Sequence, residues 1–155
     1  MIVQDIINAM VAIQHLKIIH RDLKSSNILL EIQGDVVLNA VICDFGLAKV
    51  TSKALIVEGS VFEDIAGFSV RYAAPEIFMY STLLAPPPPE IELKCDVYSF
   101  AIVLWELLSR DAAWKDLSRE EIEYKVRSRE RVFLFLLCFW FGVLDDVFLV
   151  VACAP

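Results

Sequence analysis

The chain has 155 residues, 57% of them hydrophobic, and a formal net charge of −7 at pH 7. This length suits one domain with its own hydrophobic core, and an acidic chain without a basic stripe is not expected to bind nucleic acid. No disulfide or metal spacing relates Cys43, Cys95, Cys138 and Cys153, and no signal-peptide pattern opens the chain, so we expect reduced thiols and a cytoplasmic location.

The first predicted elements are a helix and a β-hairpin. Apolar residues recur at helical spacing over residues 2–16, which predicts an amphipathic helix with one wide buried face. Residues 28–30 and 36–43 are apolar runs that predict two strands, and Gly34 and Asp35 between them are typical of a turn.

Residues 47–73 show no sustained periodicity and predict a long functional loop, which Ala74-Pro75-Glu76 closes. Four consecutive prolines, Pro86–Pro89, predict a stiff extended segment that continues neither a helix nor a strand. This segment is either a docking site for a proline-recognising module or a surface insertion between two helices. The insertion is the preferred interpretation, because no flanking basic residue completes a ligand pattern.

Two further helices are predicted towards the C-terminus. Residues 96–109 are apolar nearly all round, which predicts a central buried helix with Asp96 as its N-cap. Residues 118–121 read Ser-Arg-Glu-Glu, a capping box that predicts a short helix through Val126.

Two motifs carry the chemistry: His20-Arg21-Asp22-Leu23-Lys24-Ser25-Ser26-Asn27 and Asp44-Phe45-Gly46. Asp22 is suited to accept a proton from a hydroxyl, and Lys24 can contact a phosphate as a point charge. Asn27 and Asp44 offer the hard oxygen ligands that magnesium prefers, while Gly46 lets its loop reorient. An isolated Asp, His or Lys is more often a turn former, a structural group or a surface charge.

The ordered set is much more specific than its members. The loop motif, a hairpin, Asp44-Phe45-Gly46 and Ala74-Pro75-Glu76 follow one another in an order that resembles the C-terminal lobe of eukaryotic protein kinases. The resemblance covers residues 1–131 and implies an α+β kinase fold: a mainly helical lobe with a small hairpin, without the N-terminal lobe. The sequences of residues 20–30 and 96–107 are most similar to those of the tyrosine-kinase-like group.

The resemblance implies transfer of the γ-phosphate of ATP, with Mg²⁺, to a serine or threonine of a protein substrate. Asp22 would be the base, Lys24 would contact the phosphate and mark serine/threonine specificity, and Asn27 and Asp44 would bind the metal. The long loop of residues 47–73 would be the activation loop, and Arg21 would receive a phosphate on it. The candidates for that modification are Thr51, Ser52 and Ser60.

Five more positions receive roles through the resemblance. Ser69 would contact the catalytic Asp and Lys, and Leu29 would lie under the adenine. His20 and Phe45 would stack together in a hydrophobic spine. Asp96 would hydrogen-bond to the backbone of residues 20–27, the catalytic loop of the family.

The chain departs from the family pattern at its start. It contains no glycine-rich loop, no Val-Ala-Ile-Lys strand and no helix with the partner Glu, so it offers half of a nucleotide site. We therefore expect the chain alone not to transfer phosphate. The alternative function is a non-catalytic kinase-like binding module or scaffold.

The second departure is the apolar segment 132–155, where the family continues with two more helices and an arginine that pairs with Glu76. The preferred interpretation is a gene-model artefact, such as a translated intron or a frameshift. A membrane anchor with basic residues on its cytoplasmic flank comes next, although Asp145 and Asp146 make its insertion nearly neutral. A buried segment is the third interpretation.

Overall fold

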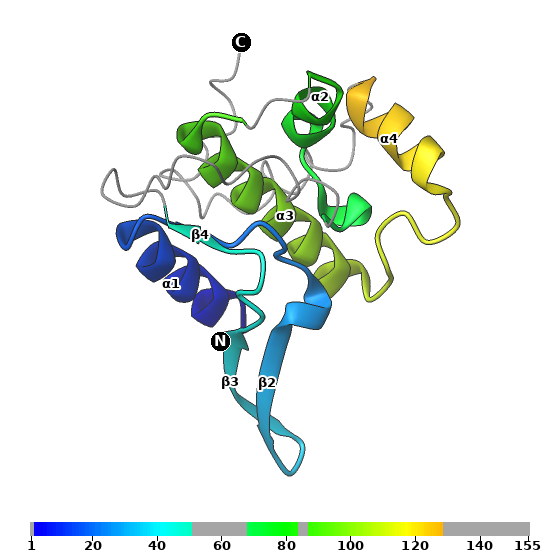
Figure 1. Ribbon diagram of the computed structural model, residues 1–155. Coiled ribbons are helices and arrows are strands. Elements are labelled where there is room, and N and C mark those ends of the chain that lie inside the picture. The colour runs from blue at the N-terminus through cyan, green and yellow to red at the C-terminus, as the bar shows by residue number, and fades with distance from the viewer. Residues whose placement is uncertain (1, 51–67, 84–86, 129–155) are drawn as a thin grey trace.

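The computed structural model describes residues 2–50, 68–83 and 87–128. In chain order, the elements are α1 (Ile2–His15), β1 (Ile18–Ile19), the 3-10 helix η1 (Ser25–Asn27), β2 (Ile28–Gln33), β3 (Val36–Ile42), β4 (Lys49–Val50), the 3-10 helix η4 (Val70–Tyr72), α2 (Pro75–Leu83), α3 (Pro89–Ser109) and α4 (Arg119–Arg127). Figure 1 shows α3 crossing the centre of the molecule, with α1 on one side and α2 and α4 on the other. The predicted class, mainly helical with a small hairpin, is confirmed.

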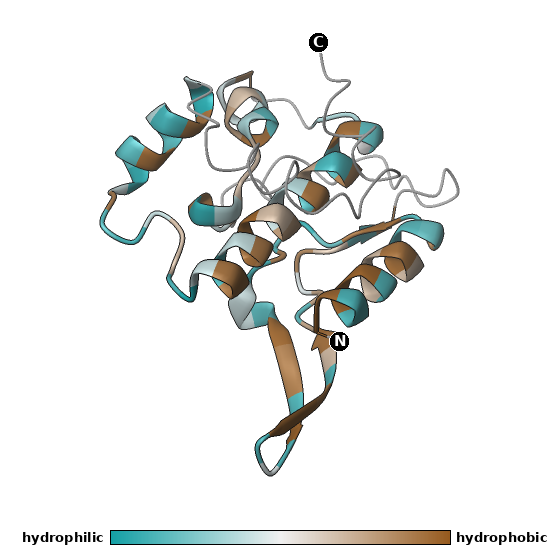
Figure 2. Cartoon of the chain, turned by 180° about the vertical axis from the view of Figure 1, so that it is seen from behind, coloured by the Kyte–Doolittle hydropathy of each residue, from teal (hydrophilic) through white to brown (hydrophobic). Residues whose placement is uncertain are grey.

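The hairpin of β2 and β3 projects from the rest of the molecule. The strands are antiparallel, from Ile28 opposite Ile42 to the two-residue turn at Gly34 and Asp35. Gly34 has a φ of 60°, the left-handed conformation that glycine adopts without steric cost. The hairpin is strongly apolar along its length (Figure 2), yet side chains such as Leu29 are more than half exposed.

A second, very short sheet pairs β1 with β4, so that Ile18 lies opposite Val50 and Ile19 opposite Lys49. This pairing was not predicted from the sequence, because strands of two residues are too short to show an alternating pattern. It matters for the site, since buried Ile19 immediately precedes the loop that begins at His20.

Two predictions about the start of α3 are wrong. The helix begins at Pro89 with Pro88 as its N-cap, so Asp96 lies inside the helix and is not its cap. The end of the proline run therefore does continue into a helix. Proline is well suited to the first helical position, because its missing N–H would have no intrahelical partner there and its φ is already helical.

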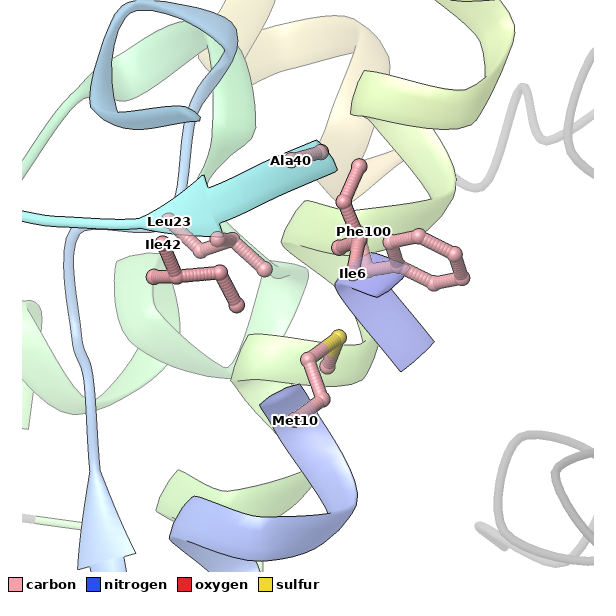
Figure 3. Packing of buried hydrophobic residues seen from close by; sticks show 6 residues of the cluster. All are labelled: Ile6, Met10, Leu23, Ala40, Ile42 and Phe100. Atoms are coloured by element: carbon pink, nitrogen blue, oxygen red, sulfur yellow. The ribbon is translucent and has the colours of Figure 1, made fainter. Parts of the chain in front are cut away.

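Two hydrophobic clusters lie against α3. The hairpin-side core joins α1, the loop after β1, β3 and α3 (Figure 3), and its buried members are Ile6, Met10, Leu23, Ala40, Ile42 and Phe100. The α4-side core joins η4, α2 and α4, and its buried members are Ala73, Phe78, Ile122 and Val126. Tyr98 of α3 packs against this second core. The central helix thus connects the two halves of the lobe.

The capping box at the start of α4 is confirmed. The Oγ of Ser118 accepts a hydrogen bond from the N–H of Glu121, and the Glu121 carboxylate accepts one from the N–H of Ser118. Thr51, Ser52, Ser60, Pro86 and the segment 132–155 lie outside the described residues. Among the helices that the structure describes, none is long and apolar enough to cross a membrane.

Candidate functional site

The centre of the site is the carboxylate of Asp22, which is 8% exposed. Its Oδ1 accepts a hydrogen bond from Ser69 Oγ at 2.7 Å. Its Oδ2 accepts one from Lys24 Nζ at 2.6 Å and a longer one from Asn27 Nδ2 at 3.3 Å. Lys24 also donates to Ser69 Oγ at 3.2 Å. These contacts fix the plane of the carboxylate and place a cation beside its charge.

Both segments that meet at the Asp22 carboxylate are fixed in place by packing against a hydrophobic core. Leu23, next to Asp22, is buried in the hairpin-side core, while Phe68 and Val70 on either side of Ser69 pack against the α4-side core. Ser69 lies 47 positions from Asp22 in the chain. The hydrogen bond between them therefore joins two separately packed regions.

Asn27 and Asp44 lie at the same end of the hairpin. The N–H of Cys43, next to Asp44, donates to the backbone carbonyl of Asn27 at 2.9 Å. The side-chain nitrogen of Asn27 donates to the backbone carbonyl of Asp22 at 2.8 Å, so its amide oxygen is not used in that contact. Buried Asn27 thus links the loop to the hairpin end that carries Asp44.

The turn at Asp44 brings its side chain close to Gly46. Asp44 has a φ of 62°, and its Oδ1 accepts a hydrogen bond from the N–H of Gly46 at 3.3 Å. A Cβ on residue 46 would lie 3.2 Å from that same oxygen, a tight approach that glycine avoids. The Asp44 side chain is exposed and available to a ligand.

The donor set suits magnesium. Among the described residues, no group of three or more His, Cys, Asp or Glu is placed to hold a metal by itself. Mg²⁺ commonly keeps several waters and binds one or two carboxylates together with substrate phosphates. One carboxylate from Asp44 and one amide oxygen from Asn27 therefore fit an ion that is also coordinated by a phosphate.

His20 is fully buried and both of its ring nitrogens have partners. Nε2 lies 3.0 Å from the carbonyl of Cys43, which can only accept, and Nδ1 lies 3.3 Å from the N–H of Asp22, which can only donate. These partners select the neutral ring with its proton on Nε2. The ring also packs on Phe45, with centroids 4.8 Å apart, as the resemblance implied.

Asp96 anchors the start of the loop from α3. Its carboxylate is buried and accepts hydrogen bonds from the backbone N–H of His20 at 2.7 Å and of Arg21 at 2.9 Å. This is the contact that the resemblance implied. Burial raises the pKa of Asp96, and the two backbone hydrogen bonds act in the opposite direction.

Arg21 has a partner that the sequence analysis missed. Its Nη2 donates to Oε1 of Glu92 at 2.6 Å, and Lys49 Nζ donates to Oε2 of the same carboxylate at 3.1 Å. Glu92 lies four positions before Asp96, on the same side of a helix. Glu92 was not placed on this helix from the sequence, because the helix was predicted to begin only at Asp96.

A second missed network surrounds Glu106 of α3. This carboxylate accepts hydrogen bonds from Tyr72 Oη at 2.8 Å, from the N–H of Ala113 at 2.8 Å and from Ser25 Oγ. Burial raises the pKa of Tyr72, and the nearby Glu106 adds to the effect. The network ties η1, η4 and α3 together behind the site.

Two predicted residues lie away from these networks. Leu29 is on β2 and 57% exposed, on an apolar surface. Glu76 lies in the first turn of α2 and forms no ion pair with any described residue. Glu76 is close enough to buried Cys95 to act on it: burial, then the charges of Glu76, Asp96 and Glu92, raise the pKa of the Cys95 thiol.

The chain is similar to known proteins over most of its length. The family model described as "Protein kinase domain" matches residues 1–139. Three similar proteins are a mitogen-activated protein kinase kinase kinase dlk-1 of Caenorhabditis briggsae (34% identical over 124 residues, 80% of this chain and 12% of the relative), mitogen-activated protein kinase kinase kinase 7 of Drosophila melanogaster (35% over 122 residues, 78% and 15%) and TGF-beta receptor type-2 of Rattus norvegicus (37% over 113 residues, 73% and 19%). The chain thus spans less than a fifth of the length of each of these three relatives.

A solved structure of the Rad53 kinase domain with SCD2 is similar in fold. It matches with a TM-score of 0.58 and 25% sequence identity, over 82% of this chain and 38% of that one.

Proposed function

Because this chain belongs to the protein kinase family, we propose that it forms the catalytic lobe of an enzyme that transfers the γ-phosphate of ATP to a serine or threonine of a protein. The observation that carries the proposal is the Asp22 carboxylate, fixed by Ser69, Lys24 and Asn27. These donors, two from its own loop and one 47 positions away, hold the carboxylate in one orientation beside a lysine, as proton transfer from a positioned hydroxyl requires.

In the proposed reaction, Asp22 takes the proton that leaves the substrate hydroxyl. The hydroxyl oxygen bonds to the γ-phosphorus while the bond from that phosphorus to the bridging oxygen breaks, and ADP leaves. Positioning and charge neutralisation supply most of the catalysis in such transfers. Lys24, at 2.6 Å from Asp22, is near enough to the reacting groups to offset charge on the transferred phosphate.

The family generally uses ATP and Mg²⁺, and we assign their binding to three positions. Asn27 and Asp44 would hold magnesium, which would neutralise phosphate oxygens when bound. The exposed apolar side chain of Leu29 would lie against the adenine. His20, Phe45 and Asp96 would keep the loop in shape without touching the substrate.

The specificity for serine and threonine is proposed on Lys24. In the family, the sequence motif His20-Arg21-Asp22-Leu23-Lys24 marks kinases that act on serine and threonine hydroxyls. The direct contact of Lys24 with both Asp22 and Ser69 agrees with a position beside the acceptor.

The proposal is tested by joining the full chain behind the upper lobe of one of its kinase relatives and supplying radiolabelled ATP, Mg²⁺ and a general protein substrate. We expect label on serine and threonine, and we expect Asp44→Ala to abolish it through loss of the metal ligand. Asp116→Ala, at an exposed position on the loop before α4, is the matched control and should keep full activity. If the folded fusion binds substrate but transfers no phosphate, the non-catalytic alternative replaces the proposal.

A further inference from the structure

Three charged side chains from three elements meet beside the catalytic loop. Arg21 comes from the loop itself, Lys49 from β4 and Glu92 from α3. Arg21 contacts one oxygen of Glu92 at 2.6 Å and Lys49 contacts the other at 3.1 Å. The Glu92 side chain is 5% exposed, whereas Arg21 is 21% and Lys49 39% exposed.

This arrangement has the chemistry of an anion site. A carboxylate this buried is costly unless cations and hydrogen bonds compensate it. Here the compensation comes from two cations, each taking one oxygen, which is also how a guanidinium and an ammonium hold a phosphate. The two cations come from two different elements and both face the one carboxylate of Glu92.

We infer that Arg21 and Lys49 form an anion pocket whose resident ligand is Glu92, so that the negative charge a phosphate would supply there is already built into the chain. The inference rests on the proposed function for its meaning, because Arg21 is the residue expected to receive an activation-loop phosphate. With Glu92 in place, the catalytic loop and β4 are joined without any modification of the chain.

The placement makes Glu92 a positioning residue for the site. Glu92 and Asp96 are one helical turn apart on α3, and both hold Arg21: Glu92 through its guanidinium and Asp96 through its backbone N–H. Lys49 lies opposite Ile19 in the short sheet, and Ile19 is the residue immediately before the loop. Glu92 therefore connects α3 to the loop that carries Asp22 and to β4.

The test is a thermal unfolding titration of the full chain and its Glu92→Gln variant with inorganic phosphate, against sodium chloride at equal ionic strength. Glutamine keeps the shape of the side chain and removes its charge. We expect the variant to lose about 4–8 °C in Tm and to recover with phosphate, while the wild type gains nothing beyond the chloride effect. Adding Lys49→Met to Glu92→Gln should abolish the recovery.

The matched control is Glu123→Gln, which removes the same charge from an exposed pair with Arg127 at 2.9 Å and should show no phosphate-specific gain. The inference is wrong if phosphate already raises the Tm of the wild type beyond the chloride effect and Lys49→Met removes that rise. It is equally wrong if Glu92→Gln gains nothing, or stays unfolded at every phosphate concentration. None of these measurements needs phosphoryl transfer, so they remain decisive even where the proposed function fails.

Discussion

At the scale of single residues, the site depends on buried carboxylates that each have a full set of donors. Asp22 has side-chain donors, Asp96 has backbone donors, and Glu92 has two cations. A buried carboxylate of this kind holds several segments at once, because each oxygen can accept more than one hydrogen bond. Replacing one of them therefore disturbs more than its own position.

The Asp96→Asn substitution tests how far the stability of the chain depends on one of these carboxylates. The amide places an N–H group where a carboxylate oxygen now accepts from the backbone of His20 or Arg21. We expect the free energy of unfolding to fall by about 1–3 kcal/mol, because a buried donor loses its acceptor. Urea denaturation of the full chain measures it, with exposed Asp116→Asn as the control that should change little. Equal stability of the two variants would show that Asp96 does not anchor the loop.

Thiol reactivity tests the electrostatics around Cys95. Alkylation requires the thiolate, and burial beside three carboxylates raises the pKa of Cys95, so its thiol stays protonated even near pH 9. Iodoacetamide followed by peptide mapping should modify partly buried Cys43 in the native chain and buried Cys95 only after denaturation. Native labelling of Cys95 as fast as Cys43 would contradict the burial described for α3.

At the scale of elements, the features that a short local sequence pattern marks were predicted, and the others were missed. The period of α1, the turn at Gly34 and the capping box at Ser118 are local patterns, and all three were predicted. The β1–β4 pairing was missed because each strand is too short to show a period. The start of α3 was missed because a proline run was interpreted only as a break, although proline is favoured at the first helical position.

The hairpin turn offers a test at this scale. Gly34 has a positive φ whereas Asp35 does not, and a Cβ on Gly34 would meet nothing within 4 Å. Gly34→Ala should therefore lower the free energy of unfolding by about 1–2 kcal/mol through backbone strain alone. Asp35→Ala in the same turn carries no such strain and serves as the control in urea unfolding. A Gly34→Ala chain as stable as the Asp35→Ala chain would refute this account of the turn.

At the scale of the whole molecule, the site lies where two cores meet across α3. The motif of residues 20–27 and Asp44-Phe45-Gly46 were recognised from the sequence, because their order along the chain is specific, and the assignment of Asn27 and Asp44 as metal ligands stays a prediction. The supporting contacts were not: Glu92 lies 71 positions from Arg21 and 43 from Lys49, and no local pattern relates them. Such pairs follow only from the way α3 brings distant segments together.

The most direct test of the central claim is the turnover of an Asp22→Asn variant, again with the full chain joined behind a relative's upper lobe. Asparagine keeps the shape of the side chain but cannot take the proton from the substrate hydroxyl. We expect kcat to fall by about 10²–10⁴-fold, with little change in KM for ATP, because Asp22 is not a proposed nucleotide ligand. Turnover equal to that of the unsubstituted fusion would contradict the assignment of Asp22 as the base.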